Sequence, residues 1–100
     1  MKVLREQKEN IMRQKLKYVK TKEGEVIIFP GTIQHSSFKC LGIISAGFCS
    51  IRNDRKIVNC YGSSFSLNLE ANVKEDSMDA TRQVFGWEAL LALDKDKLDE

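Results

Sequence analysis

Residues 25–69 read EVIIFPGTIQHSSFKCLGIISAGFCSIRNDRKIVNCYGSSFSLNL, and this stretch decides the fold. It holds the single His, the single Pro and all three Cys of the chain. β-Branched and aromatic residues gather in residues 25–29, 43–51 and 57–61, as is typical of β-strands. The sequence therefore predicts three strands in the middle of the chain.

The polar residues Asn53-Asp54-Arg55-Lys56 separate two of these strands and favour a hairpin turn. If the turn is centred on Asp54 and Arg55, Cys49 on the first strand faces Cys60 on the second. Two thiols between apolar neighbours are expected to be reduced and buried, because Cys behaves as a small hydrophobic residue.

The flanking segments supply further elements. Residues 16–21 are predicted to pair with residues 25–29 across a turn at Glu23-Gly24. Alternation of apolar and polar residues in 65–69 predicts another strand with one solvent-exposed face. Helix-forming residues predict an N-terminal helix over 3–15, a short helix over 33–40 and a helix from about 75 to 85, followed by one or two more turns from Trp87 to Leu93.

Together these elements predict a single α+β domain over residues 1–100. Its sheet is expected to be mostly antiparallel, with about five strands, an N-terminal helix, a short inserted helix and a C-terminal helix. Residues 1–15 form the basic N-terminal helix of this prediction, and residues 94–100 form a frayed acidic tail. The expected core residues are apolar and lie on the strands and the final helix: Ile28, Phe29, Ile44, Phe48, Ile57, Val58, Leu67 and Phe85.

The charge is distributed unevenly along the chain. Residues 1–23 carry eight Lys or Arg against three Glu, and residues 70–100 carry nine acidic residues against four basic ones. Such polarity is typical of a basic arm that binds nucleic acid or lipid, and also of two segments that attract each other. We expect a homo-oligomer in which the N-terminal helix packs near the acidic C-terminal region of a second copy, about a two-fold axis.

Cysteine usage and hydropathy indicate a cytoplasmic protein. Three Cys without a CxxC pair do not form the even, closely spaced pattern of a secreted disulfide framework. The N-terminal segment has no apolar core of a secretory signal, and the longest apolar run is too short to span a bilayer. We expect no membrane contact.

Few residues could carry chemistry. A polar surface site is a candidate if the helix that contains His35 and the bend after Gly62 lie at the same end of the sheet, which would bring together His35, Ser63, Ser64 and Ser66. His35 and the three Cys lack the ligand spacing of a zinc site, so neither a metal nor a cofactor is expected. No catalytic residue is assigned, since His35 has no carboxylate pattern beside it.

A nucleic-acid surface is an alternative. It would use the basic residues of the N-terminal segment, which are Lys2, Arg5, Lys8, Arg13, Lys15 and Lys17. Tyr18 is the only aromatic residue nearby in the sequence, and stacking on bases needs aromatic side chains. The sequence also carries no helix-turn-helix, zinc-finger or RRM signature.

Four segments carry a resemblance: VIIFP, His35 with Phe38, SAGF at 45–48, and CYGSSFSL at 60–67. In these the chain resembles a group of short uncharacterised proteins of bacteriophages and bacteria. The resemblance implies a phage or mobile-element accessory protein and assigns no catalytic role. We therefore expect a small non-enzymatic interaction module that acts by protein–protein contact. The alternatives are a nucleic-acid binder that uses the basic N-terminal helix and a small enzyme centred on His35.

Overall fold

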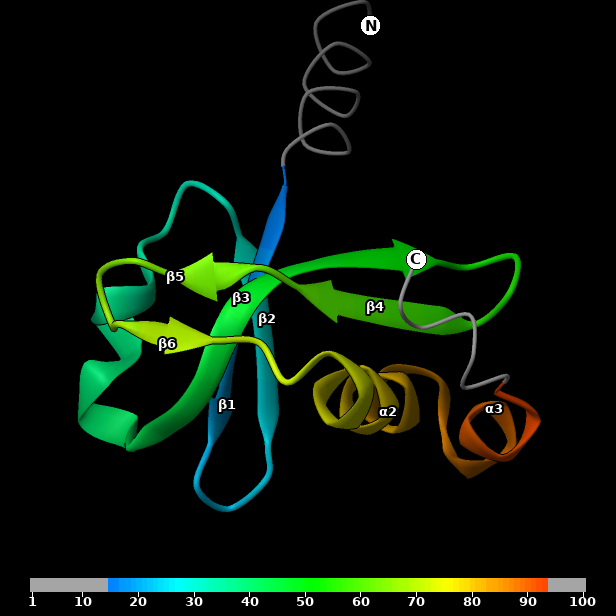
Figure 1. Ribbon diagram of the computed structural model, residues 1–100. Coiled ribbons are helices and arrows are strands. Elements are labelled where there is room, and N and C mark those ends of the chain that lie inside the picture. The colour runs from blue at the N-terminus through cyan, green and yellow to red at the C-terminus, as the bar shows by residue number, and fades with distance from the viewer. Residues whose placement is uncertain (1–14, 94–100) are drawn as a thin grey trace, which may run out of the picture.

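The computed structural model describes residues 15–93, and Figure 1 shows the arrangement of their elements. The predicted N-terminal helix, apart from its last residue, and the predicted acidic tail lie outside the described residues. In chain order the elements are β1 (Leu16–Thr21), β2 (Val26–Pro30), the 3-10 helix η1 (His35–Leu41), β3 (Ile43–Arg52), β4 (Ile57–Tyr61), β5 (Ser63–Ser64), β6 (Leu69–Glu70), α2 (Val73–Phe85) and α3 (Trp87–Ala92).

Strands β1 to β4 form one antiparallel sheet in the order β2-β1-β3-β4. Gly24 turns the β1–β2 hairpin with a φ of 88°, a conformation that glycine adopts without strain. In the β3–β4 hairpin Cys49 pairs with Cys60, so the predicted register is confirmed. Both hairpins follow from short-range sequence signals.

The predicted single sheet of about five strands is wrong. Residues 65–68 form a turn, and only two residues on either side of it pair, as the separate β5–β6 ribbon. Gly62 with a φ of 79° bends the chain away after β4, and Asn68 with a φ of 54° closes the turn. Leu67 and Leu69 still pack inward, whereas Phe65 is fully exposed, so the alternating pattern reflects a turn and not a strand.

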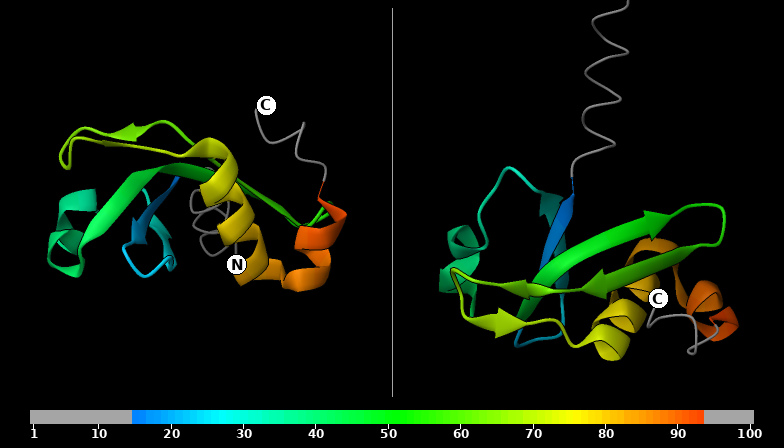
Figure 2. Two further views of the ribbon diagram at one scale, coloured as in Figure 1. Left: turned by 60° about the horizontal axis from the view of Figure 1, so that its bottom comes forward. Right: turned by 45° about the horizontal axis from the view of Figure 1, so that its top comes forward.

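The prediction of the short inserted helix also needs correction. The short inserted helix is a 3-10 helix that begins at His35, and no side chain caps its N-terminus. The helix predicted to about residue 85 and the further turns predicted from Trp87 are observed as α2 and α3, which Gly86, with a φ of 96°, separates. Figures 1 and 2 show η1 and the β5–β6 ribbon at one end of the molecule and α2 with α3 at the other.

Two apolar clusters lie on opposite faces of the sheet. Tyr18 belongs to the first cluster and Val19 to the second, and consecutive strand residues point to opposite faces. α2 covers the first cluster with Ala80 and Phe85. η1 and the β5–β6 ribbon cover the second, with Phe38 from η1 and leucines from the ribbon.

Only part of the predicted core is buried. Phe29 and Val58 are buried, and the partly buried Ile28, Leu67 and Phe85 pack against the clusters. Phe48 and Ile57 are half-buried. Ile44 is 53% exposed, so its placement in the core is wrong. It lies next to the register shift between β1 and β3, where the regular alternation of the strand is broken.

Polar side chains of α2 bind the backbone of both edge strands. Gln83 accepts a hydrogen bond from the Val26 amide of β2 at 2.8 Å and donates one to the Val26 carbonyl at 2.9 Å. On β4, Thr81 accepts from the Val58 amide at 3.0 Å and Ser77 accepts from the Cys60 amide at 2.8 Å. Unpaired edge strands are sites of aggregation, and α2 therefore protects both edges of this sheet.

Candidate functional site

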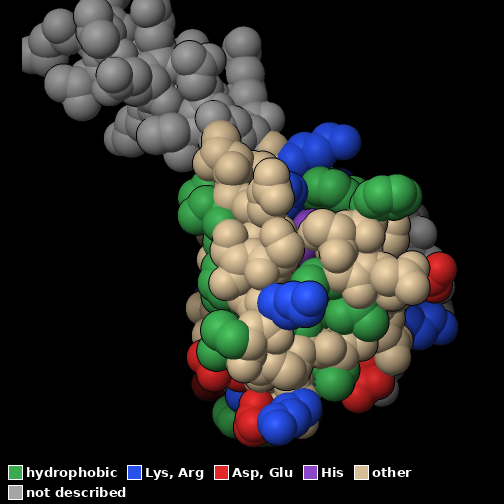
Figure 3. Space-filling view, turned by 90° about the vertical axis from the view of Figure 1, so that its left-hand side faces the viewer, with side chains coloured by type: hydrophobic (Ala, Val, Ile, Leu, Met, Phe, Trp, Pro, Cys, Tyr) green, Lys and Arg blue, Asp and Glu red, His purple; other side chains and the backbone are tan. Residues whose placement is uncertain are grey.

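An open groove lies at the end of the molecule that holds η1 and the β5–β6 ribbon. It has a cavity volume of about 530 Å³ and is lined by Lys17, Gln34, His35, Phe48, Ser63, Phe65 and Ser66. Figure 3 shows this face, with the single His visible in a hollow between basic and hydrophobic side chains. Acidic side chains lie at the lower and right-hand margins of the same view.

His35 forms the floor of the groove. Its Nε2 donates a hydrogen bond of 2.8 Å to the carbonyl oxygen of Gly47, which can only accept, so Nε2 carries a proton. The ring meets Phe29 and Phe48 edge-on, with centroid distances of 5.6 and 6.0 Å. These contacts leave the side chain only 5% exposed. His35 therefore fixes η1 against β3 and holds the base of the groove in place.

Close backbone packing shapes the wall formed by Phe48. A Cβ atom at Gly47 would overlap the carbonyl oxygen of Tyr61, and a Cβ at Gly62 would lie 3.0 Å from Phe48. Phe48 stacks on Tyr61 with a centroid distance of 6.0 Å and an interplanar angle of 28°. The Lys15 ammonium lies 5.6 Å from the centre of the Phe48 ring, within the range of a cation–π contact.

The predicted polar site is brought together only in part. His35, Ser63 and Ser66 line the groove together. Ser64 instead turns inward, where its hydroxyl accepts a hydrogen bond from the Leu67 amide at 3.3 Å. Its role is to hold the turn between β5 and β6, which presents Phe65 and Ser66 to the groove.

The basic residues predicted for nucleic-acid contact divide into two sets. Lys2, Arg5, Lys8 and Arg13 lie outside the described residues. Lys15 and Lys17 lie at the start of the described residues, beside the groove. The Lys17 ammonium donates to the carbonyl oxygen of Ile33 at 3.0 Å, which holds it at the rim.

Sequence reasoning missed Phe48, Phe65 and Gln34 as members of the site. Phe48 and Phe65 were assigned to buried or alternating strands, and Gln34 was given no role. The available signal was Gly62-Ser63-Ser64, a sequence that favours a bend and interrupts the alternation before Phe65.

A buried ionic cluster on the opposite face was also not predicted. Lys20 is 4% exposed, and its ammonium lies 2.6 Å from Asp79 and 3.3 Å from Asp76. The Tyr18 hydroxyl donates to Asp76 at 2.5 Å, and the Asn72 amide donates to the same oxygen at 3.0 Å. Each side chain of the cluster has a partner: the Asp76 Oδ1 atom makes no hydrogen bond but lies 3.3 Å from the Lys20 ammonium. The cluster therefore attaches α2 to the sheet.

The pKa values of Tyr18 and Lys20 are both raised within the cluster. Burial and the hydrogen bond to Asp76 raise the pKa of Tyr18. Burial alone would lower the pKa of Lys20, but the hydrogen bond and charge of Asp79, together with Asp76, outweigh it and raise the pKa. Both groups therefore keep their protons at neutral pH.

The two buried thiols, Cys49 and Cys60, lack the lowered pKa of a nucleophilic cysteine. Burial raises the pKa of Cys49 to about 12. The pKa of Cys60 is also raised, mainly by burial and to a smaller extent by the charge of the neighbouring Cys49. A nucleophilic Cys needs a lowered pKa. Cys40, the third free thiol, is exposed on η1. Within residues 15–93 no group of three or more His, Cys, Asp or Glu side chains could hold a metal ion.

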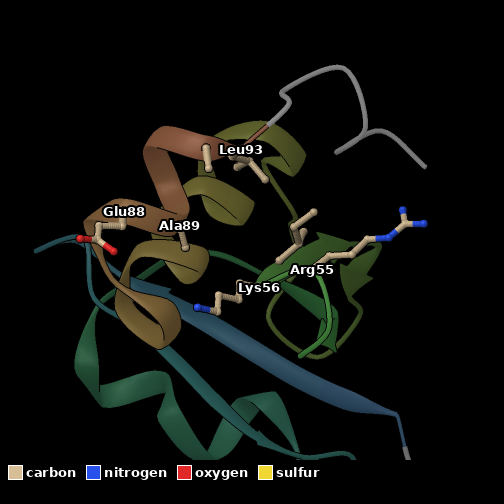
Figure 4. Close-up of a pocket in the computed structure, with 7 residues that line it drawn as sticks. Arg55, Lys56, Glu88, Ala89 and Leu93 are labelled. Atoms are coloured by element: carbon tan, nitrogen blue, oxygen red, sulfur yellow. The ribbon is translucent and has the colours of Figure 1, made fainter.

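A second, smaller hollow lies between the β3–β4 turn and α3. Its volume is about 210 Å³, and Arg55, Lys56, Ile57, Glu88, Ala89, Ala92 and Leu93 line it. Figure 4 shows the Arg55 side chain extending away from α3. Nearby, Trp87 and Leu91 on α3 and Val84 on α2 are exposed, with Arg82 stacked 5.3 Å from the Trp87 ring centre.

No protein-family model, curated protein or solved structure matches this chain. Within the described residues, neither the helices nor the 3-10 segment combine the length and hydrophobicity that crossing a bilayer would require. The site must therefore be interpreted from its own geometry and charge.

Proposed function

We propose that this protein is a small non-enzymatic interaction module and that the groove around His35 is its contact surface. The observation that carries the proposal is Phe65, whose side chain is fully exposed at the rim of a groove that also contains the half-buried Phe48. An exposed aromatic ring beside a polar groove is typical of a binding surface, because such rings contribute much of the energy of recognition.

The arrangement gives less support to an enzyme centred on His35. Nε2 is committed to the Gly47 carbonyl, and the described residues that line the groove include neither a carboxylate nor a thiol. The hydroxyls of Ser63 and Ser66 have no hydrogen bond to the imidazole among the described contacts, which a serine nucleophile with a His base would require. Binding without chemistry is the simpler function of this groove.

Photo-crosslinking tests the proposal. A benzophenone amino acid replaces Phe65 in one variant and Asn53 in the control, since Asn53 is exposed in the β3–β4 turn at the other end of the molecule. Irradiation of native cells that express each variant should give a discrete covalent adduct only from position 65. Absence of an adduct at position 65, or equal adducts at both positions, would contradict the proposal.

Self-association is a second candidate function, and the exposed Val84, Trp87 and Leu91 favour it. We propose that residues 1–14 of a second copy bind this apolar surface. The surface belongs to the acidic residues 70–100, and residues 1–23 are the basic part of the chain, so the charges are complementary. Screened attraction between exposed charges would orient this contact more than strengthen it.

Light scattering at about 100 μM tests this dimer, because micromolar association is nearly complete at that concentration. The wild-type chain should be dimeric and the Leu91→Glu variant monomeric. Leu41→Glu is the matched control, since Leu41 is also exposed but lies on η1 at the opposite end. A monomeric wild-type protein would exclude the dimer.

The sequence resemblance and the free thiols support a proposal for the biological origin and the cellular location of the protein. The resemblance to short bacteriophage and bacterial proteins supports a proposal that the module is an accessory protein of a phage or mobile element. Three free Cys fit a reducing compartment, which supports a cytoplasmic location. Fractionation of cells that express the protein, with detection by antibody, would test the location.

A further inference from the structure

The groove combines three features that are usually found together on surfaces that bind single-stranded nucleic acid. From their combination we infer that the His35 groove binds single-stranded nucleic acid, with a base stacked on Phe65 and phosphates held by Lys15 and Lys17. The inference rests on the proposed function, because it names the ligand of the same surface.

The first feature is the exposed aromatic surface. Phe65 is fully exposed on the turn between β5 and β6, so its ring is open to a stacking partner. Phe48 lines the same groove, but Tyr61 stacks on it and the Lys15 ammonium lies over its ring, so Phe48 shapes the wall and leaves Phe65 as the stacking position. Aromatic rings bind unpaired bases by stacking, and they do so with little sequence preference because every base has a flat π face.

The second feature is the distribution of charge. Lys17 lines the groove and the Lys15 ammonium lies over Phe48, while the described lining residues include no acidic side chain. The acidic residues of α2 instead surround Lys20 on the other face of the sheet, where they are partly neutralised. The charge of the groove therefore matches a ligand with negative charges and flat rings.

The third feature is the uncharged polar lining. The Gln34 amide and the hydroxyls of Ser63 and Ser66 can each both donate and accept hydrogen bonds. Such groups can contact the polar edges of any unpaired base. In a duplex these edges are paired and the bases are stacked on one another, so the groove fits single strands.

A protein partner is less well matched to this groove. Stable protein interfaces have a desolvated apolar centre, and here the one fully exposed apolar side chain of the lining, Phe65, stands among basic and hydroxyl groups. An acidic peptide would pair with the lysines but would leave the exposed Phe65 ring without a stacking partner. Single-stranded nucleic acid offers phosphates to the lysines and a base that can stack on Phe65.

Fluorescence anisotropy of labelled 12-nucleotide probes tests the inference with the purified 100-residue chain. The probes are oligo(U), oligo(dT) and a 12-base-pair duplex, each titrated at several salt concentrations from 50 mM upward. The two single strands should bind more tightly than the duplex. Their affinity should fall with salt, with a slope of about −0.7 per phosphate contacted. The difference between oligo(U) and oligo(dT) shows whether the groove prefers RNA or DNA.

Variants assign the binding to the groove. Phe65→Ala should weaken single-strand binding at least about fivefold, as expected for the loss of one stacked base, and Phe65→Tyr should restore it. Replacing Lys15 and Lys17 by Gln should make the salt slope less steep by about 1.4, which corresponds to two phosphate contacts. The controls are Leu91→Ala and Arg55→Gln at the other end of the molecule, which should bind like wild type.

Two results would overturn the inference. One is the absence of single-strand binding at 50 mM salt with about 100 μM protein, and the other is wild-type affinity in Phe65→Ala. If position 65 then still crosslinks to a protein in cells, the interaction module stands and only its ligand was misassigned. If position 65 crosslinks to nothing, both proposals are wrong.

Discussion

The two faces of the sheet use polar and aromatic side chains in opposite ways. On the face covered by α2, Lys20, Asp76 and Tyr18 are almost completely buried and contact one another. On the face that carries the groove, Phe65 is fully exposed, and Lys15 and Lys17 stand at the rim. On the face covered by α2, polar groups attach the helix to the sheet. On the face that carries the groove, an aromatic ring is open to solvent.

This difference separates structure from function within one small sheet. Burying a charge is unfavourable unless it is paired, so a buried ionic cluster must be complete, and the cluster beneath α2 has a partner for each group named above. The fully exposed Phe65 side chain buries no apolar surface in the fold, so it adds little to stability. Substitutions should therefore divide cleanly into those that change stability and those that change binding.

Asp76→Ala should have the largest effect on stability. It removes the acceptor of both Tyr18 and the Asn72 amide and one of the carboxylates beside Lys20. Loss of a buried ionic partner is expected to lower the free energy of unfolding by about 3 kcal/mol, near the lower end of the usual range because Lys20 keeps Asp79. Urea denaturation measures this change.

Glu75→Ala is the matched control for this substitution. Glu75 also contacts Lys20, at 3.6 Å, but its side chain is 66% exposed. Its removal should change the free energy of unfolding by less than about 0.5 kcal/mol. Equal losses in both variants would mean that the cluster is open to solvent and that the contrast between the two faces is wrong.

Thr81→Val should have a smaller effect through the edge strand β4. The substitution keeps the shape of the side chain but leaves the buried Val58 amide without the hydroxyl that accepts its hydrogen bond. We expect a loss of about 2 kcal/mol in urea denaturation. Thr32→Val at an exposed position should leave stability unchanged. If Thr81→Val left the free energy of unfolding unchanged, α2 would not protect the β4 edge of the sheet.

The buried thiols predict a loss of stability at alkaline pH. An unfolded Cys loses its proton near its ordinary pKa of about 8.5, whereas in the fold burial holds the pKa of Cys49 at about 12 and also raises that of Cys60. The stabilising contribution is complete below the unfolded value and is lost as the pH rises towards the folded value. Each thiol should lower stability by about 1 kcal/mol between pH 8 and pH 9.5.

Urea midpoints at these two pH values measure the slope. Cys60→Ala should reduce the pH dependence, since one of the two buried thiols is removed. Cys40→Ala should leave it unchanged because Cys40 is exposed. An equal reduction in both variants would show that burial of Cys60 is not the cause.

Short-range patterns in the sequence account for the four-stranded sheet. Runs of β-branched residues marked the strands, and turn residues set the β3–β4 register that pairs Cys49 with Cys60. The helix over Val73–Phe85 also followed from its helix-forming residues. The β5–β6 ribbon did not follow, because it depends on positive φ angles at Gly62 and Asn68, which alternation of apolar residues does not reveal.

The buried ionic cluster and the groove could not be predicted, because the residues that form each of them are far apart in the sequence. The sequence assigns Lys20 no partner, and only the fold places Asp76 and Asp79 beside it. Likewise Lys17 and Phe65 line one groove although 48 positions separate them. A lone lysine or phenylalanine carries no signal of a partner that the chain brings near only after folding.

Phe65→Ala should have the smallest effect on stability, and this result would define the groove most sharply. The side chain is fully exposed, so its removal takes no apolar surface from the core, and the free energy of unfolding should stay within about 0.5 kcal/mol of wild type. The same variant should lose the binding that the groove provides. A loss of more than about 1 kcal/mol would mean that Phe65 packs against the protein in solution, and the ring would then not be free to contact a ligand. Stability preserved together with binding lost would instead mark Phe65 as a residue that serves recognition alone.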